Sequence, residues 1–338
     1  MGSLTLFRFL LSSVFAFSDC AEIDLRPALG PPRAQDGSSW CYAHSAADLI
    51  SHAVGERISS VDIATTYLLG DERKLRRNAS GYLKDYLDHH PDFEQRLRET
   101  RKDEDAFKPE HILSSKGIVD AGGKDDQAIV LSNLKGLCLA SRLPASEQNL
   151  SKYLETIRED YLRASQKKDS PAEPMGAVQN DVAKIMAGAF QKWVDQKCGK
   201  RLQPKQPLLP HEIAVAETLD EYLHQLAARQ TNPDNARASL IAEIDRLLDQ
   251  GKPAAIGYDA YDLYPKGDSK QENPHGDHSS VIAARKKIKG SCHYFVRNHF
   301  GTTCGYRPEI EEFCEKENGG VWVPGEALKH LYVVISIR

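Results

Sequence analysis

A polar loop runs directly into a helix over residues 35–47, Gln35-Asp36-Gly37-Ser38-Ser39-Trp40-Cys41-Tyr42-Ala43-His44-Ser45-Ala46-Ala47. Cys41 lies where the polar residues end and the alanine-rich, helix-forming residues begin. In the first turn of a helix, unpaired backbone N–H groups and the helix dipole favour a negative charge. The position therefore predicts a lowered thiol pKa and a nucleophilic Cys41, against the alternative of a buried cysteine that only packs.

The composition is that of an ordinary globular protein. The chain has 338 residues, of which 41% are hydrophobic and 27% charged, and this length is enough for two domains with sizeable cores. A formal net charge of −4 gives no electrostatic ground for binding nucleic acid, so we expect no nucleic-acid partner.

The first 18 residues have the pattern of a signal peptide. Arg8 precedes a short apolar run over residues 9–17, and Ala16 and Ser18 stand at the −3 and −1 positions of a cleavage site after Ser18. The alternative is an N-terminal strand or helix of the core. With the signal removed, no stretch approaches transmembrane length, so we expect a secreted or periplasmic protein without membrane association.

The cysteine count also fits an exported protein. The chain has seven cysteines, and a nucleophilic Cys41 leaves an even set of six for disulfides. Cys304 and Cys314 flank a short polar loop, so the sequence predicts that these two form a disulfide.

Helical patterns fill most of the chain up to residue 250. They predict helices over 40–54 and 59–69, a highly charged surface insertion over 71–110 without an apolar face, and a helix after Gly122 and Gly123 that ends at Gly136. Residues 146–250 are predicted to be almost wholly helical. The last ninety residues instead predict the strands of an antiparallel sheet, over 253–258, 278–284, 293–298, 321–323 and 331–337. The fold class is therefore α+β.

Two residues of the predicted sheet complete a site with Cys41. A nucleophilic cysteine needs a base, a group that orients the base, and donors for the oxyanion. His278 begins one strand and Asn298 ends the next one across a hairpin. Asn298 can then orient the His278 ring through its side-chain oxygen, while Gln35 and the Cys41 backbone N–H form the oxyanion hole.

These motifs resemble those of the papain-like cysteine peptidases. The resemblance covers roughly residues 22–70, 112–147 and 240–338. It is carried by Ile23-Asp24-Leu25-Arg26, the loop and helix over 35–47, Gly122-Gly123, the strand over 253–260, His278, and Asn298-His299-Phe300-Gly301-Thr302 in place of Asn-Ser-Trp-Gly-Thr. His278 and Asn298 follow Cys41 at more than the family's about 130–150 residues, and helical insertions at about 71–110 and 148–238 account for the excess.

The resemblance implies one catalytic domain over 19–338, with a papain-like two-domain fold and a β-barrel-like sheet domain. A cleft would separate Cys41 on the helical side from His278 on the sheet side, and the resting site would be a thiolate–imidazolium pair. Gly122 and Gly123 would bind the substrate backbone, Gly257 would line the main side-chain pocket, and Asp277 would lie near its rim. The substrates would be peptides or proteins, with no cofactor or metal, and an inhibitor or partner protein could bind the helical insertions.

The expected function is that of an exported cysteine endopeptidase. Cys41 would form the acyl-enzyme and His278 would act as general acid and base, which predicts a bell-shaped pH profile with the thiol on the acid limb and the imidazolium on the alkaline limb. Two alternatives remain open at this point. One is an acyltransferase or amidase on the same residues, and the other is a non-catalytic binding protein that keeps the cleft.

Overall fold

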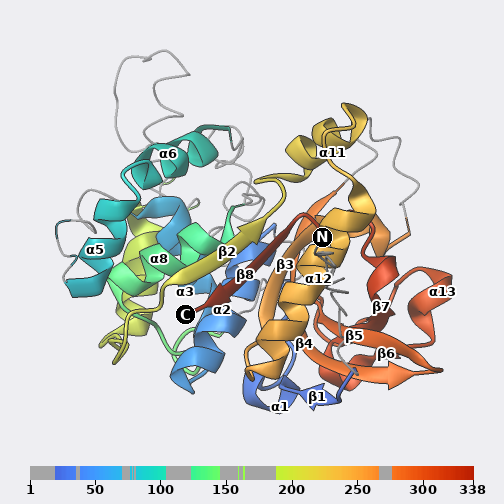
Figure 1. The fold of residues 1–338 in the computed structure, drawn as a ribbon. Helices are drawn as coiled ribbons and strands as arrows, with labels where there is room; N and C mark the ends of the chain where they lie inside the picture. The colour runs from blue at the N-terminus through green and yellow to red at the C-terminus, as the bar shows by residue number, and fades with distance from the viewer. Residues whose placement is uncertain are drawn as a thin grey trace, which may run out of the picture.

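The computed structural model describes residues 20–35, 39–70, 81–103, 123–144, 188–265 and 276–338, together with Arg77, Ala79, Glu159 and Arg163. The expected signal peptide over 1–18, Gly122, and parts of the two expected insertions lie outside these residues. Where the structure is described, one side consists mainly of helices, and the other side holds an antiparallel sheet with further helices beside it, as Figure 1 shows. The predicted α+β class is therefore confirmed.

The helical side is built around α2 (Cys41–Val54), which follows the polar loop as predicted. Ten consecutive residues from Tyr42 to Ser51 are buried, and Gly55 ends the helix in the left-handed conformation that favours glycine. The helix α2 packs against α3 (Ser60–Leu69) and α8 (Asp125–Lys135), both of which the sequence predicts. Ser59 caps α3 by accepting a hydrogen bond from the backbone N–H of Asp62.

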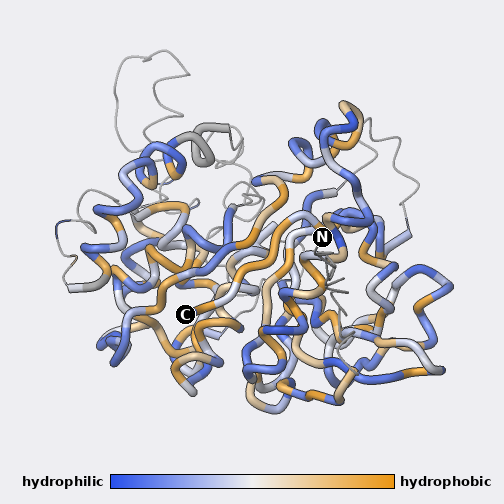
Figure 2. The backbone as a smooth tube through the Cα atoms, viewed as in Figure 1, coloured by the Kyte–Doolittle hydropathy of each residue, from blue (hydrophilic) through white to orange (hydrophobic). Residues whose placement is uncertain are grey.

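The charged segment after α3 has an apolar face that its sequence pattern hides. It contains α5 (Gly81–His89) and α6 (Phe93–Asp103), and α6 is mostly hydrophilic in Figure 2. Two side chains of each helix are nevertheless buried against the helical core, namely Leu83 and Leu87 of α5 and Phe93 and Leu97 of α6. The prediction of a surface insertion without an apolar face is wrong here, because one residue per turn on each short helix is enough to dock it.

The sheet has the strand order β2-β8-β3-β4-β5-β7-β6, and all of its pairs are antiparallel. In chain order its strands are β2 (Pro210–Ala214), β3 (Ala254–Asp259), β4 (Asp277–Ile288), β5 (Ser291–Arg297), β6 (Cys314–Glu315), β7 (Gly320–Pro324) and β8 (Val333–Ile337). The short strand β1 (Ile23–Asp24) pairs with β4 outside this path. Between the strands lie α1 (Arg26–Leu29), α11 (Leu219–Ala227), α12 (Pro233–Asp249) and α13 (Pro308–Glu311), with short 3-10 turns at Ala260–Asp262, Lys316–Asn318 and Gly325–Ala327.

The strand β2 corrects the prediction that residues 146–250 are almost wholly helical. It pairs with β8 from Pro210↔Ile337 to Ala214↔Val333 and so extends the sheet at one end. A strand of five residues with this polar composition gives no strand pattern in the sequence, and the pairing with β8 selects the extended conformation. Part of the expected insertion over 148–238 thus belongs to the central sheet. No helix that the structure describes is long and apolar enough to cross a membrane.

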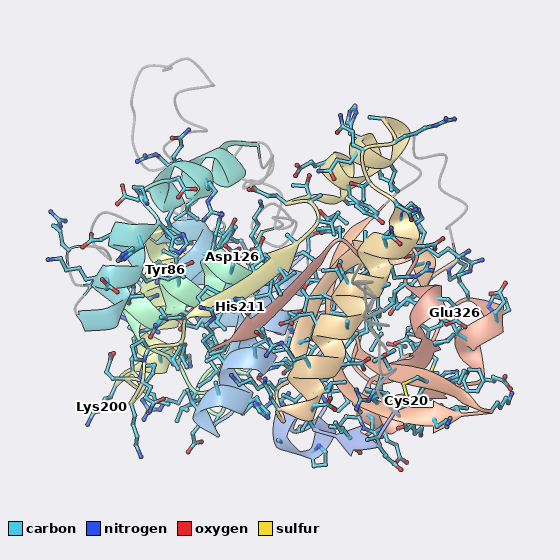
Figure 3. All side chains as sticks on the ribbon, in the orientation of Figure 1. Cys20, Tyr86, Asp126, Lys200, His211 and Glu326 are labelled. Carbon is cyan, nitrogen blue, oxygen red and sulfur yellow. A yellow bond between two sulfur atoms is a disulfide. The ribbon has the colours of Figure 1, made fainter. Side chains whose placement is uncertain are left out.

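Three disulfides join the six cysteines other than Cys41, which is consistent with an exported protein. The predicted Cys304–Cys314 pair is confirmed. Cys20, labelled in Figure 3, joins the N-terminal arm to β5 through Cys292.

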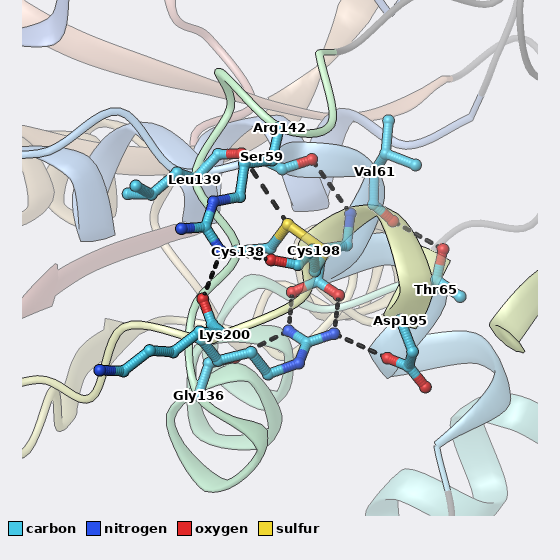
Figure 4. Close-up of a disulfide and its surroundings, with 12 residues drawn as sticks. Ser59, Val61, Thr65, Gly136, Cys138, Leu139, Arg142, Asp195, Cys198 and Lys200 are labelled. Atoms are coloured by element: carbon cyan, nitrogen blue, oxygen red, sulfur yellow. Dashed lines mark hydrogen bonds and ion pairs between the residues drawn. A yellow bond between two sulfur atoms is a disulfide. The ribbon is translucent and has the colours of Figure 1, made fainter. Parts of the chain in front are cut away.

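The third disulfide, Cys138–Cys198, closes a loop of 60 residues on the helical side (Figure 4). Replacing both cysteines by serine should lower the free energy of unfolding by about 4 kcal/mol, because the open chain gains loop entropy when it unfolds. Urea denaturation followed by circular dichroism measures this loss. An unchanged midpoint would contradict the prediction, and the double serine variant of Cys304 and Cys314, whose separation is only 10 residues, should lose less.

Candidate active site

A cavity of about 430 Å³ lies between the N-terminal end of α2 and the strands β3, β4 and β8. It brings together six of the residues that the sequence predicts for the site, namely Gln35, Cys41, Gly123, Gly257, Asp277 and His278. Asn298 does not line the cavity but contacts His278 from behind, and Gly122 lies outside the described residues. Residues separated by more than half of the chain thus share one cavity.

Cys41 is the first residue of α2 and carries the free thiol. Burial is the main cause that raises the pKa of this thiol to about 12, and the carboxyl groups of Asp125 and Asp277 contribute in the same direction. Backbone N–H groups of Ser279 and Tyr42 act in the opposite direction but are outweighed. The predicted lowering of the thiol pKa is therefore wrong for the free site, because burial dominates over the helix terminus.

The His278 side chain is held in a defined orientation by Asn298. Asn298 Oδ1 accepts a hydrogen bond from the backbone N–H of His299 at 2.7 Å, which identifies this atom as the oxygen. The same oxygen lies 3.1 Å from His278 Nε2. Since an oxygen can only accept, Nε2 carries the proton, and Nδ1 of the neutral ring is left as the basic nitrogen.

Aromatic rings surround His278 on the sheet side. Phe300 stacks on the imidazole with a centroid distance of 5.7 Å, and Tyr258 and Tyr264 meet it edge-on at 5.7 and 6.5 Å. Burial lowers the pKa of His278 to about 4, although the hydrogen bond to Asn298 raises it. Burial therefore favours a neutral imidazole and a neutral thiol in the free site, in contrast to the expected thiolate–imidazolium pair.

Gln35 reaches the cavity from an extended arm that precedes α2. Its backbone N–H donates to the carbonyl oxygen of His299 at 2.6 Å, and the neighbouring Ala34 forms a β-bridge with Phe300. The arm is thus attached to the segment that directly follows Asn298. This attachment places the Gln35 side chain on the same cavity as Cys41.

The two described glycines of the predicted site are required by internal packing. A Cβ at Gly123 would lie 2.6 Å from Tyr67 and 2.8 Å from Tyr42, and one at Gly257 would lie 2.5 Å from Val333. The close approach that these glycines allow is therefore to side chains of the chain itself. Both still form part of the cavity wall.

Sequence reasoning missed an acidic wall of the cavity, which consists of Asp125, Asp126, Glu212 and Glu217 in addition to Asp277. Arg96 and Lys124 also line it, and Lys124 pairs with Glu217 at 3.2 Å. Burial and the nearby Asp126 raise the pKa of Glu212 to about 7. Asp125 and Asp126 follow the glycine pair after Lys124, and this closeness could have indicated them, whereas Glu212 lies on the unpredicted β2.

A buried polar chain connects the wall to both halves of the site. Ser279, next to His278 on β4, lies 2.8 Å from Ser45 Oγ on α2 and 2.9 Å from Asp125 Oδ1 on α8. Burial raises the pKa of Asp125 well above its usual value, although the hydrogen bond with Ser279 lowers it. These hydrogen bonds between Ser279, Ser45 and Asp125 fix β4, α2 and α8 relative to one another.

One group among the described residues has the composition of a metal site, namely Asp62, Cys138 and Cys198. Both sulfur atoms form a disulfide and Asp62 pairs with Arg201, so these residues are structural. They also lie outside the cavity.

Comparisons with known proteins give a fold likeness only. No family model matches the chain, and no curated protein sequence is similar to it. Similar solved structures include digestive procathepsin L2 from Tenebrio molitor larval midgut, with 12% identity and a TM-score of 0.41 over 94% of this chain and 67% of that one. PepW from Lactobacillus rhamnosis has 14% identity and a TM-score of 0.42 over 93% and 81%. Bromelain from Ananas comosus, solved with the E64 inhibitor, has 10% identity and a TM-score of 0.40 over 94% and 99%.

Proposed function

We propose that this chain is an exported cysteine endopeptidase in which Cys41 is the nucleophile and His278 the general acid and base. The observation that carries the proposal is the shared cavity, whose lining includes both a free thiol at a helix start and an imidazole whose Nε2 is held by Asn298. Geometry of this kind serves acyl transfer, since it supplies a nucleophile, a base and a group that orients the base. The three disulfides support export to an oxidising compartment, either outside the cell or in a periplasm.

Acylation begins from the neutral pair. Cys41 Sγ forms a bond to the scissile carbonyl carbon while its proton passes to His278 Nδ1. The side-chain amide of Gln35 and the Cys41 backbone N–H donate to the resulting oxyanion. The C–N bond then breaks, the leaving amine takes the proton from His278, and a thioester remains on Cys41.

Deacylation returns the site to its first state. A water molecule gives a proton to His278 Nδ1 as its oxygen bonds to the thioester carbon. The C–S bond breaks, the peptide acid leaves, and Sγ regains the proton. Asn298 keeps the ring in one tautomer throughout, so that Nδ1 faces the reacting atoms in both steps.

Covalent labelling tests the proposal directly. A thiol-directed epoxide peptidomimetic should modify Cys41 and no other residue at neutral pH, since the other six cysteines form disulfides. Intact-mass spectrometry followed by peptide mapping measures the modification. The Cys41→Ala variant is the control and should remain unlabelled. A wild-type Cys41 that stays unmodified under these conditions would favour a non-catalytic binding protein.

The pH dependence of hydrolysis should show a broad plateau. His278, with a pKa of about 4, is neutral above that pH, and the thiol, with a pKa of about 12, keeps its proton across the neutral range. We therefore expect kcat/KM to fall about tenfold per unit below pH 4, as protonation removes the base, and to change little up to about pH 10. The Glu212→Gln variant removes a carboxyl whose pKa is about 7 and shows whether this group contributes to the profile. An acid limb near pH 7 in both proteins would contradict the neutral pair.

A further inference from the structure

A single carboxylate on the nucleophile helix binds two arginines in the core. Asp48 lies two helical turns after Cys41 on α2 and is fully buried. Its Oδ1 is 2.5 Å from Arg33 Nε, and its Oδ2 is 2.8 Å from Arg297 Nε. The arginine side chains are only 2% and 1% exposed, so both ion pairs are dry. His299 Nε2 lies 3.5 Å from Asp48 Oδ2 as a third neighbour.

The two arginines come from the two other segments that build the site. Arg33 lies on the extended arm, two residues before Gln35, and Arg297 is the last residue of β5, directly before Asn298. The two segments also bond to each other, since the backbone N–H of Gly301 donates to the carbonyl oxygen of Arg33 at 2.8 Å. Asp48 therefore connects the helix of Cys41 with the segments of Gln35 and Asn298.

The remaining guanidinium groups fix the path of the arm. Arg297 donates to the carbonyl oxygens of Gly30 at 3.0 Å and Pro31 at 2.6 Å. Arg33 donates to the carbonyl oxygen of Ile58 at 2.8 Å and to Ser51 Oγ at 3.1 Å. Both arginines are thus held by directional bonds at several atoms, and neither can shift without breaking some of them.

In this cluster the Asp48 side chain is an ionised carboxylate. Burial would raise the pKa of Asp48, but Arg297 and Arg33 outweigh it and hold the pKa well below its usual value. One carboxylate thus serves two guanidinium groups. Well-packed apolar residues of similar volume would stabilise a core at least as well as buried ions, so the directionality of these bonds is what the cluster adds.

We infer that Asp48 is a positioning residue, which acts through Arg33 and Arg297 to hold Gln35 and Asn298 in register with Cys41. The carboxylate gives one oxygen to each arginine, so the distance between the arm and the end of β5 is set by a rigid group on α2. Its catalytic consequence rests on the proposed function, since it concerns the oxyanion donor and the group that orients His278. Its geometric consequence does not rest on that function, because the hydrogen bond with Asn298 fixes the tautomer of His278 whether or not the site is catalytic.

The test compares two buried carboxylates. Asp62 on α3 is 1% exposed and binds Arg201 at 2.6 and 2.7 Å, but it lies outside the cavity. Asp48→Asn and Asp62→Asn each remove one buried charge while keeping the side-chain shape, and both should lower the urea midpoint. Nitrogen chemical shifts of the His278 ring, read by ¹⁵N NMR on folded protein, report its tautomer without any need for activity. Hydrolysis of a fluorogenic peptide gives kcat and KM.

For Asp48→Asn we expect mixed His278 tautomers and a kcat lowered about 10- to 100-fold, with KM within about twofold. For Asp62→Asn we expect the wild-type tautomer and kcat. Unchanged His278 signals in Asp48→Asn, at a destabilisation equal to that of Asp62→Asn, would overturn the inference. If wild-type protein shows neither hydrolysis nor labelling, the proposed function fails, and the NMR comparison still decides the positioning role.

A milder variant can test the inference if Asp48→Asn does not fold. Arg297→Lys keeps the positive charge beside Asp48 but loses the bonds to Gly30 and Pro31, since an ammonium group lacks the planar fork. It should shift the His278 tautomer in the same direction as Asp48→Asn. A wild-type tautomer in folded Arg297→Lys would overturn the inference as well.

Discussion

Replacing Cys41 by alanine should lower kcat/KM for peptide hydrolysis by about 10⁴-fold or more, because it removes the free thiol that forms the acyl-enzyme in the proposed mechanism. The other six cysteines form disulfides. The alanine is small and lies at the start of α2, where it favours the helix, so the fold and the urea midpoint should be retained. The measurement is the initial rate on a fluorogenic peptide, with active protein quantified by circular dichroism and by the unchanged midpoint.

The same assay separates two reactions that share this nucleophile. An added amine that captures the acyl group in place of water would reveal an acyltransferase, and mass spectrometry of the products distinguishes the two outcomes. Peptide hydrolysis that survives in Cys41→Ala would refute the assignment of the nucleophile, whichever acceptor is used.

The second large effect concerns the base. His278→Ala should lower kcat/KM by about 10³- to 10⁴-fold, since the thiol then loses the imidazole that accepts its proton in the proposed mechanism. Asn298→Ala should cost only about 10- to 100-fold, because it removes one hydrogen bond to the ring and leaves the ring itself. The two substitutions should not be additive, since Asn298 acts through His278.

The thermodynamic cycle of the two single variants and the double variant checks this point. We expect His278→Ala and the double variant to have the same residual rate within about twofold. Additive losses would mean that Asn298 contacts substrate independently of His278. Phe300 stacks on the His278 ring, so Phe300→Leu provides a packing control that should change the rate less than Asn298→Ala.

The site was predictable where function and local structure use the same residues. The polar loop before Cys41 ends where the alanine-rich helix begins, so a short stretch of sequence defines both the helix and its reactive end. His278 lies on β4 and Asn298 directly follows β5, and the pairing of these two strands, whose apolar patterns are strong, brings the two residues together. In both cases the placement of the candidate residues could be predicted from their neighbours in the sequence.

The parts that were missed depend on contacts between distant segments. The strand β2 has no pattern of its own and forms because β8 offers an unpaired edge. Asp48 has the appearance of an ordinary polar residue in a helix, and its two partners, Arg33 and Arg297, come from opposite ends of the chain. The thiol pKa was predicted from the helix start alone, whereas burial between two layers decides its direction.

Because β2 lies at the edge of the sheet, the part of the cavity wall that it carries can be exchanged without changing the other strands. This strand pairs with β8 at the end of the strand order, and Glu212 on it and Glu217 just after it face the cavity from outside the elements that carry Cys41, His278 and Asn298. Exchange of residues 210–218 for a segment of different charge should therefore change which substrates the cavity binds, while Cys41, His278 and Asn298 stay in place. Variation in this one segment is a route by which a common chemistry could be directed to different targets.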